Sequence, residues 1–555
     1  MPTKHKRLLA WIKENKELVV CFLLYLVITF LFALIFHENW EDEAQAWLIA
    51  RDASLPELIS QMKIEGHLLP WYLLIRPVAK LGLPFKAINI VSWAIGGVTA
   101  WLYLRYLPCK KWKRVALIFS LPMIYFYPVV ARSYCLLPLA IILLIMSYPK
   151  RFTHPWPYLL AAVLAANVHI HCFVFALTLG VEFLIEWRRK RKHFLEAANR
   201  RIIVAMAGSI LIATLSYLPI LGSMGESAES GIKLKPFEFV QFFAGNVQAY
   251  AAPLAGTFSG LFIMALIAVL VCYLILYRRD VFYKMTPTVL WDFAISSLVW
   301  AIVLPQRAFI PIFCLIFFLL RTPKPVTSPE LKPLIKLGIF LAMLTMIVFC
   351  SNIFFSLLAF CFAAMAFLPR PLKARYDNLP NIRALVSGFY GLLLAVAVIS
   401  GINYLYKEFK YTYSDALATS QYIREHLSTE PGIFLTNVGS EIIYTPVIAY
   451  LDNDFRLFNV NAEEFYSYVS WPQPDLTKQI EVKDLRQFCL DGQKCYYVLY
   501  YSPSTEAILS AVVEKTMIDQ WEQDNILVKL YDSGAEDDDW NQADTEHYRI
   551  YEVIK

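Results

Sequence analysis

The sequence predicts a polytopic α-helical membrane protein with a soluble, extracytoplasmic α/β domain at its C-terminus. Of the 555 residues, 58% are hydrophobic and only 17% are charged, whereas a soluble chain keeps about a quarter of its residues charged. Many apolar runs approach the ~20 residues that a membrane-spanning helix needs. Charge also changes sign along the chain, because residues 1–402 hold 39 Lys and Arg against 19 Asp and Glu, while residues 403–555 hold 12 against 26. A soluble enzyme, a disordered chain and a small disulfide-stabilised protein are therefore excluded.

Long apolar stretches divide the first 402 residues into candidate spans. In chain order they lie at 18–36, 87–104, 115–130, 135–148, 157–169, 171–186, 202–221, 256–277, 286–303, 308–320, 335–351, 352–368 and 384–402. Several are shorter than the ~20 residues of a straight span, so those around 130 and 170 are also consistent with broken or re-entrant helices. We therefore predict a transmembrane domain at 1–402 with about 13 spans, followed by a soluble domain at 403–555.

Basic residues indicate the side of the membrane on which each connection lies, because Lys and Arg near span ends stay in the cytoplasm. Every second connection is basic, namely the N-terminus, 110–114, 150–151, 188–201, 278–284, 321–336 and 370–383. This alternation predicts a cytoplasmic N-terminus. With an odd number of spans, the acidic domain lies outside the cytoplasm, together with the loops at 37–86, 131–134, 222–255 and 304–307.

The C-terminal region alternates strand-like and helical runs, which predicts a small α/β domain. The strand-like runs are 432–436, 495–501 and 526–530, and the helical runs are 415–426 and 504–514. Cys489 and Cys495 flank a turn-like sequence and are either a short disulfide loop in an oxidising compartment or two unrelated thiols. The acidic balance excludes nucleic acid as a partner, since phosphate binding needs clustered Lys and Arg.

The first external loop is the most informative stretch for chemistry. Glu38, Asp42 and Glu43 follow the first span closely, and the segment 65–72 adds a further Glu, a His and two aromatic residues. A carboxylate this close to a bilayer is unremarkable when solvated and costly when buried. Asp42 stands three residues before Gln45 where an external helix begins, so capping of that helix is a structural alternative to a functional role.

The sequence contains no Gly-rich phosphate loop, no zinc-type Cys/His spacing and no nucleophile elbow, so chemistry driven by ATP or NAD is unsupported. His169 and His171 are two positions apart inside an apolar stretch. The alternatives for this pair are lining of a cavity, binding of a metal ion and a purely structural role. No third ligand is identified for them. The sequence thus indicates no definite cofactor and leaves a divalent metal ion open.

Several short motifs point together to one family. They are the Asp42-Glu43 pair with the segment 65–72, Tyr125-x-Tyr127, 131–137, His169-x-His171, 304–307 with Pro311, 413–416, 446–450 and 465–471. In this order and topology the chain resembles the GT-C membrane glycosyltransferases, in particular family 39 (the protein O-mannosyltransferases) and the aminoarabinose transferases of lipid A. One departure is that the segment 129–134 lacks the acidic residue that some members carry in their second external loop. That departure weakens the case for a second carboxylate or a bound divalent ion.

The resemblance implies a GT-C fold in the bacterial inner membrane. It also implies transfer of one sugar, with inversion, from a polyprenyl-phosphate donor to an acceptor hydroxyl on the external face. The acceptor is a lipid, a protein or a glycan. A phosphate-linked sugar already has a good leaving group, so the enzyme must deprotonate the acceptor and stabilise charge on the departing phosphate. Asp42 is the candidate base because the family's base falls on this residue, with Glu43 as the alternative if the helix is rotated.

Three basic residues are candidate ligands of the donor phosphate: Arg132, Arg307 and His67. Arginine presents fixed donors that match phosphate oxygens, although snorkelling or pairing with lipid headgroups is the alternative for each Arg. The candidate substrate-binding residues are Trp40, Trp47, Tyr72, Tyr134, His169, His171 and Glu226. For the aromatic residues, packing or a membrane-interface belt is the ordinary alternative to a sugar platform.

Two other classes of function compete with the enzyme. A transporter or flippase of lipid-linked sugars also needs many spans, but it usually has internal repeats and ionisable residues near the bilayer midplane. Here the charges cluster at span ends and the C-terminal domain is large, which favours the enzyme. An inactive relative that serves as a scaffold in surface-polymer assembly is the third class.

Overall fold

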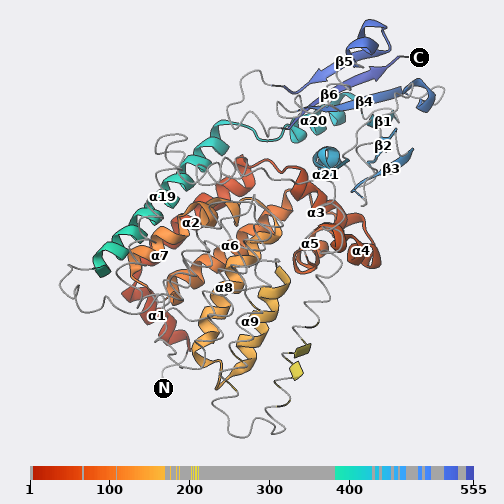
Figure 1. Cartoon of the computed structure of the whole chain (residues 1–555). Coiled ribbons are helices and arrows are strands. Elements are labelled where there is room, and N and C mark those ends of the chain that lie inside the picture. The colour runs from red at the N-terminus through yellow and green to blue at the C-terminus, as the bar shows by residue number, and fades with distance from the viewer. Residues whose placement is uncertain are drawn as a thin grey trace, which may run out of the picture. The chain divides into compact units, whose positions relative to one another are not determined.

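The structure is a computed structural model of the chain (Figure 1). It describes residues 4–65, 68–107, 109–168 and 382–427, single positions between 176 and 211, and these parts of the C-terminal region: 432–436, 441–451, 455–460, 463–469, 485–489, 494–501, 518–534 and 546–554. Apart from those single positions, the spans predicted between 171 and 368 lie outside the described residues. The predicted helix at 504–514 also lies outside them.

The chain divides into two compact units. The first comprises Met1–Tyr25, Val98–Ile124 and Leu136–Asn403, and the second comprises Leu26–Gly97, Tyr125–Cys135 and Tyr404–Lys555. The second unit therefore joins the first external loop and a short segment around residue 130 to the C-terminal domain.

Three helices of the described part are long and apolar enough to cross a membrane: Lys16–Phe36, Ala87–Tyr106 and Ser133–Lys150. They coincide with the spans predicted at 18–36, 87–104 and 135–148, and they indicate that the chain associates with a membrane. Their elements are α2 (Lys16–Leu31), η1 (Phe32–Phe36), α6 (Ala87–Tyr106), η3 (Ser133–Cys135), α8 (Leu136–Ser147) and η4 (Tyr148–Lys150).

The other described helices of this part are less regular than the sequence predicts. The stretch predicted at 115–130 is broken into α7 (Lys111–Ile118) and a π-helical turn, η2 (Pro122–Phe126), and its two prolines oppose a continuous helix. The shorter apolar helix α9 (Pro155–Val168) stands where a span is predicted at 157–169. Helix α1 (Lys4–Glu14) precedes α2, and α19 (Ile382–Lys410) covers the span predicted at 384–402.

Within the second unit, the first span and α6 approach each other closely at a glycine near the middle of α6. A Cβ atom added to Gly97 would lie only 2.8 Å from Leu26 Cδ2. Nearby, Trp93 Nε1 donates a hydrogen bond of 3.1 Å to the Leu26 carbonyl oxygen, and the ring of Phe30 meets the edge of Trp93 at 5.4 Å. A larger residue at position 97 would therefore require the end of the Leu26 side chain to move.

The segment between the first two candidate spans, which the sequence predicts to be the first external loop, contains α3 (Glu41–Asp52), α4 (Leu55–Glu65) and α5 (Pro70–Lys80). Acidic residues occupy the first turn of α3 and Arg51 its last turn, which is the arrangement that the helix dipole favours. One side of α3 packs against α5, and α21 (Thr445–Tyr450) of the C-terminal domain also contacts α3 (Figure 1). These contacts bury every residue of α3 from Glu43 to Arg51.

The C-terminal domain is built on a six-stranded mixed sheet in the order β3-β2-β1-β4-β6-β5. Strand β1 pairs in parallel with β2 and β4, whereas β6 runs antiparallel to β4 and β5. The strands are β1 (Gly432–Thr436), β2 (Leu457–Asn459), β3 (Glu464–Tyr466), β4 (Lys494–Tyr501), β5 (Leu527–Asp532) and β6 (His547–Val553). Its described helical elements besides α21 include α20 (Ala416–Tyr422), η7 (Ile423–Leu427), η8 (Glu441–Tyr444) and η9 (Leu485–Phe488), and residues 518–523 are also helical.

The predicted α/β character of this domain is confirmed by β1, β4, β5 and the helical run from α20 to η7. The sequence reasoning missed β2, β3 and β6. Strands β2 and β3 have three residues each, too few to display an alternating pattern.

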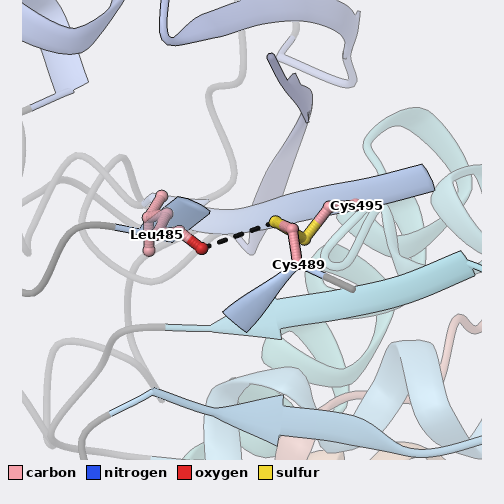
Figure 2. The surroundings of a disulfide bond; sticks show 3 residues. All are labelled: Leu485, Cys489 and Cys495. Carbon is pink, nitrogen blue, oxygen red and sulfur yellow. Dashed lines mark hydrogen bonds between the residues drawn. A yellow bond between two sulfur atoms is a disulfide. The ribbon is translucent and has the colours of Figure 1, made fainter. Parts of the chain in front are cut away.

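Cys489 and Cys495 form a disulfide (Figure 2). Both cysteines belong to the hydrophobic core of the C-terminal domain, with Leu485, Tyr497 and Leu527. Of the two alternatives for these cysteines, the disulfide loop is therefore the one that the structure contains.

Candidate functional site

Helix α3 begins one residue before Asp42, and Asp42 is not its N-cap. The cap position is Trp40, whose backbone N–H donates a hydrogen bond of 3.3 Å to Glu43 Oε2. The structural alternative that made Asp42 the cap, with Gln45 as its partner, is therefore wrong. The carboxylate that reaches back to the start of the helix is Glu43, which leaves Asp42 available for another contact.

Asp42 forms an ion pair with Arg132, through Asp42 Oδ2 and Arg132 Nη1. The Asp42 side chain is 27% exposed and that of Arg132 only 10%. A molecule from outside can thus reach the carboxylate, while the guanidinium is held among its neighbours. Two segments that lie 90 positions apart in the sequence meet at this pair.

Aromatic rings surround the guanidinium of Arg132. Its Cζ atom lies 5.8 Å from the ring centroid of Trp40 and 5.3 Å from that of Tyr134, within the range of cation–π attraction. Trp40 in turn meets Tyr413 edge to face at 5.3 Å. Trp40 and Tyr134 therefore lie beside the Asp42–Arg132 pair.

Trp47 and Tyr72 have different surroundings from Trp40. Trp47 is 1% exposed and packs against Phe85, with ring centroids 6.0 Å apart. Tyr72 is also 1% exposed, and its hydroxyl donates a hydrogen bond of 3.3 Å to Glu65 Oε2. In this structure both residues pack inside the first external loop and present no open surface to a sugar.

Glu43 is completely buried and both of its carboxylate oxygens have partners. Oε1 accepts a hydrogen bond of 2.5 Å from the backbone N–H of Ala131, and Oε2 lies 2.9 Å from His37 Nε2 in addition to its bond with Trp40. A carboxylate with these contacts has no path to an acceptor hydroxyl. The geometry separates the two adjacent acids into an accessible Asp42 and an internal Glu43.

His37 links Glu43 to the end of α19. Its Nδ1 atom lies 2.7 Å from Glu408 Oε1, and the hydroxyl of Tyr125 donates to Glu408 Oε2. Burial opposes the charged form of His37, but the carboxylates of Glu43 and Glu408 outweigh it and raise the pKa of His37 to about 9. We call His37, Glu43 and Glu408 the His37 clamp.

The backbone beside His37 is anchored by a second set of polar contacts. Lys86 Nζ donates to the His37 carbonyl oxygen and, at 3.2 Å, to Asn39 Oδ1. Asn39 Nδ2 donates to Asn89 Oδ1 at 2.8 Å, and Asn89 Nδ2 donates to the Val129 carbonyl oxygen at 3.0 Å. These bonds connect the end of the first span to the start of α6 and to the Arg132 segment.

Glu38, next to His37, is a mostly buried acid. Burial, followed by the negative charge of Asp415, raises its pKa to about 7, and Lys86 counteracts this only in part. Its Oε2 atom has no hydrogen-bond partner among the described residues. Neutral pH thus lies close to the titration of this side chain.

The C-terminal domain holds α3 through backbone and side-chain hydrogen bonds. The amide of Gln45 donates to the Val469 carbonyl oxygen at 3.1 Å and accepts from the Val469 N–H at 3.0 Å. Thr445 Oγ1 donates to the Glu41 carbonyl oxygen at 3.2 Å, and Glu546 Oε1 accepts from the Glu41 N–H at 3.1 Å. The domain therefore contributes directly to the position of the helix that carries Asp42.

Several sequence-predicted residues lie outside the described residues, and the structure does not bear on them. They are His67, His169, His171, Glu226 and Arg307. In the described part of the chain, no three His, Cys, Asp or Glu side chains form a group that fits a metal ion.

The sequence reasoning missed His37 and Glu408, although each has a recognisable signal. His37 is the first residue after the first span, and Glu408 is the one acidic residue of α19. An ionisable side chain at the end of an apolar helix is unusual unless it has a partner, and here the two are partners.

No protein-family model, curated protein or solved structure matches this chain. Its class follows from its own features: a membrane-associated protein with three candidate spans in its described part, a mixed-sheet domain and a buried charged cluster beside Asp42.

Proposed function

We propose that the protein is an integral membrane glycosyltransferase with a GT-C fold and about 13 spans, located in a bacterial inner membrane with its C-terminal domain outside the cytoplasm. It moves a sugar from a polyprenyl-phosphate donor to an acceptor hydroxyl on the external face. The observation that carries the proposal is the Asp42–Arg132 pair. An accessible carboxylate and a largely buried guanidinium meet there, close in sequence to the outer ends of two candidate spans.

The proposed reaction needs two groups of opposite charge at one place. The acceptor oxygen attacks the anomeric carbon, its proton passes to Asp42, and the bond between that carbon and the phosphate oxygen breaks. The departing phosphate carries the bonding electrons and gains negative charge, which Arg132 stabilises. Attack from the side opposite the phosphate inverts the configuration of the sugar.

Arg132 suits the phosphate role because a guanidinium carries five N–H donors in a planar fork. It can therefore contact a carboxylate and a phosphate at the same time, which the single ammonium of Lys does less well. The rings of Trp40 and Tyr134 orient the guanidinium, so that it serves both partners without reorganising.

The test compares two Asp→Asn variants in the same helix. We expect Asp42→Asn to lower sugar transfer by about 10²- to 10⁴-fold, the usual contribution of a general base. Asp52→Asn is the matched control because Asp52 ends α3 and pairs with Arg51, at 2.8 Å between Oδ1 and Nε. It should keep the rate within a few-fold. The assay follows radiolabelled sugar from polyprenyl phosphate into product, with purified protein in lipid nanodiscs.

Two outcomes would contradict the proposal in different ways. Equal turnover by Asp42→Asn and the unsubstituted protein would remove Asp42 as the base. Absence of transfer by the unsubstituted protein over a panel of polyprenyl-phosphate sugars would remove the enzyme and favour a transporter or a scaffold.

A further inference from the structure

One carboxylate fixes the backbone on both sides of the Asp42–Arg132 pair. Glu43 directly follows Asp42 in the chain, and Ala131 directly precedes Arg132. The hydrogen bond of 2.5 Å from the Ala131 N–H to Glu43 Oε1 therefore joins the neighbours of the two paired residues. The position of Asp42 relative to Arg132 depends on where the Glu43 carboxylate lies.

The Glu43 carboxylate is itself held by the rest of the His37 clamp. His37 Nε2 lies 2.9 Å from Glu43, and His37 Nδ1 lies 2.7 Å from Glu408. His37, Glu43 and Glu408 are 3%, 0% and 4% exposed, respectively, so water does not compete for these bonds. A continuous series of contacts thus runs from the end of α19 to the Asp42–Arg132 pair.

The clamp is strongest with a charged imidazole. Both ring nitrogens of His37 then carry a proton and can donate to Glu43 and Glu408 at the same time. If one proton is lost, a bare ring nitrogen faces a carboxylate oxygen and one of the two bonds becomes repulsive.

We infer that His37 and Glu408 are positioning residues that act through Glu43 to hold Asp42 against Arg132. The catalytic importance of that pair rests on the proposed function, whereas the clamp itself is a claim about the protein alone. Tyr125 supports the clamp by donating its hydroxyl hydrogen to Glu408.

The groups that face His37 determine the pH at which the clamp opens. The titratable and charged groups that face it, directly or through Glu408, are Glu43, Glu408, Lys86, Glu38 and Tyr125. Because the pKa of His37 rises from its ordinary value of 6.5 to about 9, the stability that protonation contributes is complete below pH 6.5. It is then lost as the pH rises to about 9.

The test measures hydrogen exchange of the Ala131 amide between pH 6 and pH 10, expressed as protection relative to the intrinsic rate at each pH. The full-length protein is used in lipid nanodiscs, with no substrate added. Protection in the unsubstituted protein should fall with a midpoint near pH 9. Glu408→Gln removes one of the two carboxylates, so its midpoint should move at least one pH unit lower.

The chain offers a matched control. Asp52 Oδ1 lies 2.8 Å from Nε of the buried Arg51, close to the separations in the clamp. Besides burial, the groups that shift the pKa of Asp52 are Arg51, Ser467 and Arg456, and none of them belongs to the clamp. Asp52→Asn should leave the Ala131 midpoint unchanged. If Glu408→Gln reduces insertion of the protein, Tyr125→Phe removes only the hydroxyl that donates to Glu408. It should move the midpoint to higher pH, because the Glu408 carboxylate then holds the His37 proton more strongly.

The results separate the clamp from the proposed function. A shifted midpoint in Glu408→Gln or Tyr125→Phe, with none in Asp52→Asn, supports the clamp even if no sugar is transferred. An unshifted midpoint in both clamp variants, or an equal shift in the control, overturns it. If the protein transfers sugar, the alkaline limb of its rate profile should move together with the Ala131 midpoint, which a purely structural role would not require.

Discussion

Asp42 and Glu43 are adjacent acids, yet the fold places them in opposite environments. Successive side chains of an α-helix are turned by about 100° from one another, so the two carboxylates cannot share one environment. Glu43 faces inward, where backbone N–H groups and His37 surround it. Asp42 faces Arg132 and retains exposure to solvent. Of the two candidates for the base, only Asp42 is therefore placed to meet an acceptor.

Arg132 provides a second test of the site that is independent of the base. We expect Arg132→Lys to raise the donor KM by about ten- to a hundredfold, since one charge-assisted hydrogen bond is worth about 1.5–3 kcal/mol. The ammonium keeps the charge but cannot bridge Asp42 and a phosphate as a guanidinium does.

The matched control for Arg132→Lys is Arg51→Lys, because Arg51 pairs with Asp52 at the far end of α3. Initial rates at varied polyprenyl-phosphate sugar give both KM values. An unchanged donor KM in Arg132→Lys would remove this residue from the donor site.

The start of α3 could be predicted only in part from the local sequence. The sequence correctly predicted a helix that begins near Asp42. The same reasoning assigned the cap to Asp42, because local rules compare only residues a few positions apart. Instead, the Glu43 side chain accepts the hydrogen bond from the Trp40 N–H at the start of the helix. The other partners of Glu43, Ala131 and His37, come from outside the helix. No pattern within 41–52 carries that information.

Glu546 is a buried acid that bonds the first N–H of α3. Burial raises its pKa well above the ordinary carboxyl value, and the charge of Glu41 adds to the effect. The hydroxyl of Tyr548 donates to the Ile443 carbonyl oxygen at 2.8 Å and, at 3.4 Å, to Glu546 Oε2. These donors favour the ionised acid, but burial outweighs them and favours the protonated form.

A neutral isostere should therefore replace Glu546 without loss. We expect Glu546→Gln to be at least as stable as the unsubstituted protein. Its relative advantage should grow as the pH rises above about 4.5, because the unsubstituted acid ionises more readily when unfolded. Glu546→Ala should lose about 1–3 kcal/mol because the Glu41 N–H is left unpaired.

Thermal unfolding of both Glu546 variants between pH 5 and pH 8 in detergent checks this expectation. Lower stability of Glu546→Gln than of the unsubstituted protein at pH 8 would show that Glu546 is ionised in the folded protein.

For the chain as a whole, the sequence was sufficient to predict membrane helices and a separate C-terminal α/β region, because both have strong periodic signals. It did not reveal that the first external loop and the C-terminal domain form one compact unit. The contacts responsible, such as Gln45 with Val469 and Glu41 with Glu546, join positions more than four hundred residues apart. They use ordinary polar residues without any local signature.

Hydrogen bonds between α3 and the C-terminal domain require both to lie on the same side of the membrane. The disulfide between Cys489 and Cys495 is typical of an oxidising compartment and therefore predicts that this side is extracytoplasmic. Basic residues at 110–114 predict that the connection after α6 lies on the cytoplasmic side. Leu81 and Trp112 are 77% and 47% exposed on either side of α6, so single cysteines at these positions report the two sides of one span.

Labelling of intact cells with a membrane-impermeant maleimide tests this arrangement. The single cysteines are introduced into a variant that keeps only Cys489 and Cys495. We expect Leu81→Cys and Glu464→Cys, an exposed position on β3, to react at once, and Trp112→Cys to react only after the membrane is permeabilised. Cys489 and Cys495 should stay unlabelled until a reductant is added, because oxidised sulfurs do not react. Labelling of Trp112→Cys in intact cells would reverse the orientation, whereas opposite behaviour of Leu81→Cys and Glu464→Cys would contradict the contacts between α3 and the C-terminal domain.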